Sequence, residues 1–185
     1  ESMTRSRRQR LHARVASTLR ERFPDITENQ PEILAQHFEK GSEGEIAVEY
    51  WLRAGERALA RAAYVEARLQ LERGVALLGT LPESSKRRRQ EVELLTALGT
   101  AHISTKGFGS EEVSRTFARA RMLCEQLGDD IPLKVLGGIY GVHVTRVDAE
   151  AASEILPHFR RLAQRTDDPA AAFAGHQVLG IHGFW

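Results

Sequence analysis

Small residues recur at long and regular intervals along this chain, inside segments rich in alanine and leucine. Gly55, Gly99 and Gly180, with Tyr140 at the intervening place, are separated by 44, 41 and 40 residues. Alanine and leucine favour helix because they lose little side-chain entropy there. A small residue at a fixed place lets two helices approach closely, while large residues fill the flanks. The recurrence therefore predicts a stack of antiparallel helix pairs.

The residues around each recurrence follow the order of a helix-pair repeat. In the first repeat, large, small and aromatic residues occur at the offsets of the tetratricopeptide pattern. The second repeat matches this pattern with a two-residue insertion after Phe108, and the third repeat matches it loosely. The predicted packing residues are Trp51, Gly55, Tyr64, Ala67, Gly74, Leu98, Gly99, Phe108, Phe117, Ala120, Ala152 and Gly180. We predict an all-α fold, a tetratricopeptide-like right-handed superhelix of antiparallel helix hairpins.

The same pattern predicts how the chain is organised. We interpret residues 1–3 as a cloning scar and the chain as a piece of a longer protein. Residues 4–41 are expected to form helices that join the repeats to an upstream domain. Repeats are expected over 42–185, at about 43–82, 86–128, 131–166 and from 168, where a truncated fourth begins. Gly41 is predicted as a helix-ending C′ glycine, Ser42 and Glu45 as a capping box, and Pro157 as a kink.

Several ordered segments resemble one family of bacterial proteins. The segments are residues 10–24, 30–38, 50–55, 105–113 and 117–129. Together they are similar to a region of bacterial adenylate/guanylate cyclase-like proteins that follows an AAA/STAND-type ATPase domain. The resemblance covers most of residues 8–185. It implies a tetratricopeptide-like scaffold between an ATPase module and an output domain, which is a cyclase in some relatives and a DNA-binding domain in others.

Composition and motifs limit the chemistry open to the chain. Charged residues make up 28% and the net charge is +1, so we do not expect nucleic acid as a partner. No apolar stretch suits a membrane span, and a single cysteine fits a reducing, cytoplasmic compartment. The sequence has no phosphate-binding loop, no His-Glu-x-x-His motif and no cysteine pair. We therefore assign no catalytic residue, cofactor or metal ligand, and expect no enzyme activity from these 185 residues.

Several histidines, aspartates and arginines could bind a metal ion, a nucleotide or a nucleic acid, but we predict structural roles for them. His102 and His143 occupy the same repeat position, and His176 and His182 lie in the truncated fourth repeat. We expect the repeat position to lie at a helix seam in preference to a metal or nucleotide site, and Cys124 to be a buried thiol. The paired aspartates Asp129, Asp130, Asp167 and Asp168 are expected to cap helices. N-terminal arginines are interpreted as a solvated face or a docking face for the upstream domain, ahead of contacts to nucleic acid. These are Arg5, Arg7, Arg8, Arg10 and Arg14.

The first helices of each pair are expected to line a concave surface that contacts partners. The residues predicted there are Glu49, Leu52, Glu56, Thr96, Thr100 and Ile103. The sequence thus predicts a non-catalytic scaffold that mediates contacts with its own ATPase and output domains or with another protein, including a second copy. The alternatives are a stand-alone peptide-binding repeat module and the repeat region of an ATPase-type transcriptional regulator. An enzyme and a nucleic-acid binder are further classes that remain open to experiment.

Overall fold

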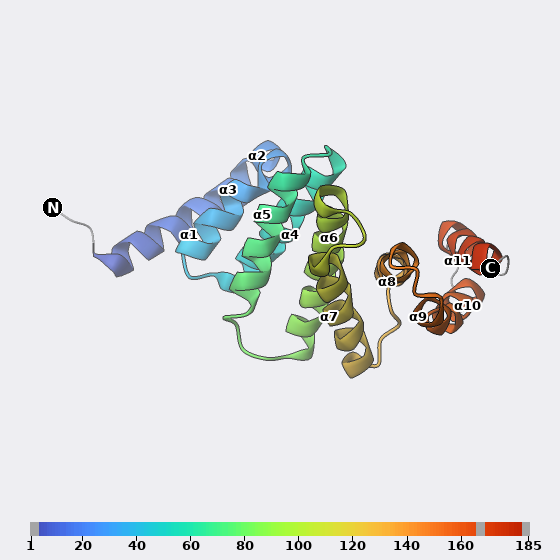
Figure 1. Cartoon of the computed structure of the whole chain (residues 1–185). Coiled ribbons are helices and arrows are strands. Elements are labelled where there is room, and N and C mark those ends of the chain that lie inside the picture. Colours follow the sequence, from blue (N-terminus) through green and yellow to red (C-terminus); the bar gives the residue numbers. More distant parts are fainter. Residues whose placement is uncertain (1–3, 166–168, 183–185) are drawn as a thin grey trace. The chain divides into compact units, whose positions relative to one another are not determined.

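The computed structural model describes residues 4–165 and 169–182, and every regular element within them is a helix (Figure 1). The helices are α1 (Arg5–Arg22), α2 (Pro24–Asn29), α3 (Pro31–Lys40), α4 (Gly44–Ala60), α5 (Tyr64–Leu78), α6 (Ser85–Lys106), α7 (Glu111–Leu127), α8 (Leu133–Thr145), α9 (Ala149–Glu154), α10 (Leu156–Arg165) and α11 (Pro169–His182). The expected all-α fold is confirmed. None of the described helices combines the length and the apolar character needed to cross a lipid bilayer. The chain forms two compact units that divide between Ala101 and His102, inside α6.

The first unit packs the N-terminal helices and the first predicted helix pair around two adjoining cores. α1 lies against α3, α3 against α4, and α4 against α5 (Figure 1). One core joins α1, α3 and α4 and includes Phe38 and Trp51. The other joins α4, α5 and the first part of α6 and includes Leu71 and Leu94. Helices of residues 4–41 therefore share a core with the first helix pair.

Two glycines allow α4, α5 and α6 to lie close together. A Cβ atom added to Gly55 would lie 2.3 Å from Cγ of Leu71. One added to Gly74 would lie 2.9 Å from Cδ2 of Leu94 and 3.1 Å from Cβ of Trp51. Carbon atoms in ordinary contact are about 3.5–4.0 Å apart, so a larger side chain at either place needs its neighbours to move. Small residues in these helices thus permit the dense packing of the first unit.

The turn between α3 and α4 differs from the expectation. Gly41 has a right-handed conformation (φ −81°), and Ser42 takes the left-handed one (φ 64°). No capping box forms, because Glu43 occupies the N-cap position of α4 without a side-chain cap. Gly41 is the C-cap residue of α3, so it ends the helix as predicted. It also has a packing role, since a Cβ atom there would lie 2.8 Å from the backbone nitrogen of Ala13. Glycine lets the backbone of α1 rest directly on this turn.

The second unit contains α7 to α11 and the last turn of α6. Two further glycines lie on α8 against aromatic rings that precede it in the chain. A Cβ atom on Gly138 would lie 2.2 Å from the ring of Phe117, and one on Gly141 would lie 2.4 Å from the ring of Phe108. α7 begins with a side-chain cap from Ser110. These two glycines therefore determine how closely α8 approaches α7 and the loop that precedes α7.

The helix boundaries agree with several expectations and correct others. α9 ends at Glu154 and α10 begins at Leu156, one residue before Pro157, so the predicted interruption of this helix is confirmed. Pro31 and Pro169 begin α3 and α11. α2, which starts at Pro24, was not predicted. Pro132 is the N-cap residue of α8, so neither Asp129 nor Asp130 takes that position. The predicted caps Asp167 and Asp168 lie outside the described residues.

Candidate functional site

Most of the residues predicted to set helix packing are buried. In the first unit these are Trp51, Gly55, Ala67, Gly74, Leu98 and Gly99, and in the second they are Phe117, Ala120 and Ala152. The other three are exposed. Tyr64 begins α5 and is 37% exposed. Phe108 is 38% exposed although its ring lies against Gly141, and Gly180 is exposed with no described atom within 4 Å of its added Cβ position.

A groove in the first unit runs between α4 and the first part of α6. Its volume is about 340 Å³. Three of the six residues predicted to contact partners, Glu49, Leu52 and Glu56, line it from α4. The groove is completed by Val48, Arg53, Gln90, Glu93 and Leu94. The structure thus brings half of the predicted contact residues into one concave feature.

The other three predicted contact residues lie elsewhere. Thr96 and Thr100 follow Glu93 by three and seven residues, so they continue the same face of α6 beyond the groove. Their hydroxyl groups donate to carbonyls one turn earlier, at Val92 and Thr96, over 2.7 and 3.1 Å. Ile103 belongs to the second unit. The prediction missed Gln90 and Glu93, because α6 begins at Ser85 and its first turns face α4.

The groove combines an apolar floor with an acidic rim. Val48 and Leu94 are buried and Leu52 is half-buried, whereas Glu49, Glu56 and Glu93 are exposed. Among the described residues, no cationic group lies within 4.0 Å of these three carboxylates. The guanidinium of Arg53 lies over the ring of Tyr50, 5.1 Å from its centroid. Such a surface suits a partner that presents basic and apolar side chains together.

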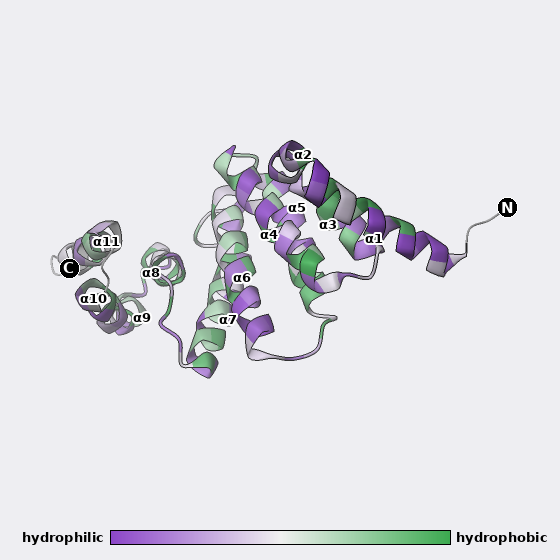
Figure 2. Cartoon of the chain, turned by 180° about the vertical axis from the view of Figure 1, so that it is seen from behind, coloured by the Kyte–Doolittle hydropathy of each residue, from purple (hydrophilic) through white to green (hydrophobic). Residues whose placement is uncertain are grey.

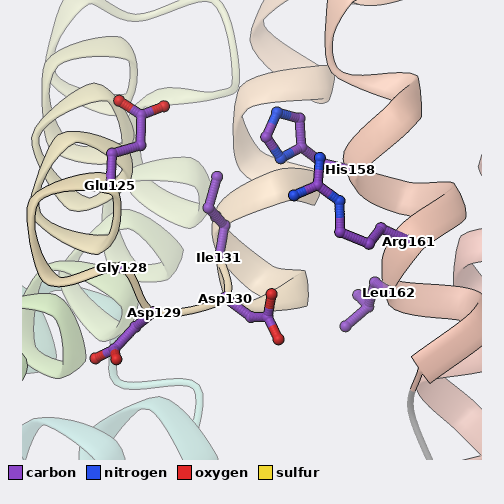
Figure 3. Close-up of a pocket in the computed structure, with 8 residues that line it drawn as sticks. All are labelled: Glu125, Gly128, Asp129, Asp130, Ile131, His158, Arg161 and Leu162. Atoms are coloured by element: carbon purple, nitrogen blue, oxygen red, sulfur yellow. The ribbon is translucent and has the colours of Figure 1, made fainter.

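A second concave feature lies within the second unit, between the end of α7 and α10. It is a pocket of about 620 Å³. Its lining consists of Glu125, Gly128, Asp129, Asp130, Ile131, His158, Arg161 and Leu162. Figure 3 shows Arg161 extending from α10 toward the α7–α8 loop, while the Asp129 carboxylate points away from α10. Arg121 donates to the Glu125 carboxylate at 2.7 Å, which neutralises one wall of the pocket.

Burial governs the titration of two groups in this unit. Desolvation lowers the pKa of His158, the guanidinium groups of Arg121 and Arg161 lower it further, and Glu125 opposes them. Desolvation also raises the pKa of the Cys124 thiol, with smaller contributions from the carboxylates of Asp129 and Glu125. The thiol is 2% exposed. A buried thiol whose pKa is raised is a poor nucleophile, which agrees with a structural role.

The histidines named in the sequence analysis lie in different surroundings. His102 is buried, and His143 lies 3.6 Å from the Asp148 carboxylate through its Nδ1 atom. His176 is exposed, and the side chain of His182 lies outside the described residues. Within residues 4–165 and 169–182, no three His, Cys, Asp or Glu side chains are arranged to hold a metal ion.

Comparison with known proteins identifies one distant relative. An uncharacterized protein of Rhizobium meliloti (strain 1021) is 32% identical over 131 residues. The match covers 68% of this chain and 13% of that protein, so the chain spans a small part of a much longer relative. No family profile matches the chain, and no solved structure matches it.

Proposed function

We propose that this chain is a non-catalytic, tetratricopeptide-like helical scaffold within a longer bacterial, ATPase-linked signalling protein, of the kind associated with adenylate/guanylate cyclases. The order of the motifs quoted above supports the family. The great length of the Rhizobium relative supports a place inside a multidomain protein. The scaffold is proposed to work in the cytoplasm and to relay contacts between the ATPase and output domains.

Close packing at small residues supports the helical-repeat part of this proposal. Gly55 accommodates Leu71, and Gly74 accommodates Trp51 and Leu94, so three successive helices stack with little space between them. Stacked helix pairs that each contact only their neighbours build a superhelix with a continuous concave surface. A second tight approach, of Gly138 to Phe117, extends the same packing mode to the second unit.

The observation that carries the proposed contact site is the groove between α4 and α6. Glu49, Leu52 and Glu56 belong to the predicted concave face and line the groove on α4. Glu93 lines the same groove on α6. Three carboxylates without a cationic partner among the described residues, above an apolar floor, provide a binding surface for a basic, apolar-bearing segment of a neighbouring domain. Binding there would couple the position of that domain to the scaffold.

The test is binding in trans between this chain and the flanking domains of the longer protein, produced separately and measured by titration calorimetry. The double variant Glu49→Lys/Glu56→Lys reverses two exposed charges at the groove. The matched control is Glu150→Lys/Glu154→Lys, which reverses two exposed charges on α9. We expect the groove variant to weaken binding at least tenfold, which is about 1.4 kcal/mol, and the control to leave it unchanged.

Three outcomes would contradict the proposal. If the flanking domains do not bind, or if both variants weaken binding equally, the groove is not the contact site. If the chain instead binds free basic peptides while ignoring the flanking domains, it is a stand-alone peptide-binding module. Circular dichroism of each variant checks that the helices are intact.

A further inference from the structure

A third concave feature, distinct from the proposed contact site, lies in the first unit between α1 and the α3–α4 turn. It is a groove of about 520 Å³ lined by Arg5, Arg8, Gln9, His12, Glu39, Lys40 and Ser42. Figure 2 shows that hydrophilic residues dominate the N-terminal part of α1. Three of the lining side chains are permanently cationic at neutral pH. We call this feature the basic groove.

The carboxylate in the lining is already occupied. Oε2 of Glu39 accepts from Nε1 of Trp51 at 3.0 Å and from Nε of Arg73 at 2.9 Å. Oε1 of Glu39 accepts from Nη2 of Arg73 at 3.1 Å. This bidentate pair is a strong form of ion pair, and it balances the charge of Glu39. The basic groove therefore keeps the charge of Arg5, Arg8 and Lys40.

Those three cations have no anionic partner within the part of the chain that the structure describes, where no carboxylate lies within 4.0 Å of them. Arginines elsewhere on the surface do have one: Arg68 pairs with Glu72 and Arg121 with Glu125. The first turn of α1 contains no acidic residue, and its N-cap Thr4 makes no side-chain cap. Positive charge at a helix N-terminus is unfavourable because it opposes the macrodipole. An anion in the basic groove would relieve this repulsion.

Contacts between α1 and the α3–α4 turn hold the walls of the basic groove in place. Gly41 lets α1 contact the α3–α4 turn at Ala13, as described above. Nε2 of Gln9 donates to Oγ of Ser42 at 3.0 Å and ties the helix to the turn. Ser42 has a left-handed conformation that is uncommon for a residue with a side chain. Its hydroxyl hydrogen and the second amide hydrogen of Gln9 are further donors at the same place.

We propose that the basic groove binds a phosphate-type anion, either free or as the phosphoryl group of a larger molecule. Guanidinium and ammonium groups are the side chains that recognise phosphate, arginine by paired hydrogen bonds and lysine as a point charge. Two arginines, one lysine and neutral donors from Gln9 and Ser42 converge on one concave surface. This inference stands independently of the proposed scaffold function, because it rests on different residues of the first unit.

The test measures binding of inorganic pyrophosphate to this chain by titration calorimetry at low ionic strength, where screening is weak. The groove variant Arg5→Gln/Arg8→Gln/Lys40→Gln removes three lining charges. The matched control Arg7→Gln/Arg10→Gln/Arg14→Gln removes three exposed charges of α1 that do not line the groove. We expect the groove variant to weaken binding at least about tenfold, since it removes the charged groups that would donate hydrogen bonds to the anion. The control should change it less than about threefold.

Duplex DNA and vesicles containing an anionic phospholipid serve as parallel probes. If either binds and depends on the groove variant as pyrophosphate does, the anion is a phosphoryl group of that larger molecule. The proposal is overturned if pyrophosphate does not bind, or if both triple variants lose the same affinity. It is also overturned if DNA binds without pyrophosphate, because α1 would then act through diffuse charge alone.

Discussion

Two adjacent glycines of α8 offer a sensitive measure of helix packing in the second unit. A Cβ atom on Gly138 would lie 2.2–2.5 Å from three ring atoms of Phe117, whereas one on Gly137 would have no neighbour within 4 Å. Phe117 is 1% exposed, so its ring has little room to move. Alanine gains about 1 kcal/mol over glycine in a helix at either position. Overpacking a dense core costs about 1–3 kcal/mol.

The difference between the two variants isolates the cost of the clash, because the gain in helix propensity cancels. We expect Gly137→Ala to stabilise the protein by about 0.5–1 kcal/mol. Gly138→Ala should be about 1–3 kcal/mol less stable than Gly137→Ala. Urea unfolding followed by circular dichroism measures both, with an unchanged slope as the check that the same surface is exposed. Equal stabilities for the two variants would refute the packing described for α8.

Three further predictions concern the first unit. Gly41→Ala places a methyl group 2.8 Å from the backbone nitrogen of Ala13, and it should destabilise the protein by about 1–3 kcal/mol in urea unfolding. Glu39→Gln replaces the carboxylate that pairs with an arginine and accepts from Trp51, and it should cost about 1–2 kcal/mol in the same assay. Burial, then a neighbouring imidazole and ammonium group, lower the pKa of His37 below 6.5, so the unfolded chain binds the proton more tightly. The free energy of unfolding should therefore keep the full contribution of neutral His37 above pH 6.5 and decrease as the pH falls below 6.5. Urea unfolding at several pH values measures this, and His37→Gln should reduce the dependence on pH.

The helical class and several boundaries could be predicted from the sequence because the signals are local. Pro169 begins α11 where a fourth repeat was expected from residue 168. The order of large and small residues around Gly55 indicated a close helix pair, and the structure has Leu71 against that glycine. Pro157 correctly indicated an interrupted helix.

The remaining features depend on contacts between segments distant in the chain. Gly41 ends α3 as the sequence indicated, but its close approach to Ala13 could not be predicted, because Ala13 lies far away in sequence. The glycines of α8 were not recognised, because their partners Phe108 and Phe117 belong to another helix pair of the repeat pattern. For the groove that we propose as the contact site, the repeat pattern indicated the residues of α4. The residues of α6 could not be predicted, because they depend on how far that helix extends before Gly99.

The scaffold proposal is tested most directly by the solvent accessibility of Leu52 within the longer protein. Hydroxyl-radical labelling can compare this side chain in the isolated chain and in the longer protein, with Leu69 of α5, which is 55% exposed, as the internal reference. We predict that labelling of Leu52 falls several-fold in the longer protein while labelling of Leu69 stays the same. Equal labelling of Leu52 in both proteins would contradict the assignment of this groove to contacts between domains.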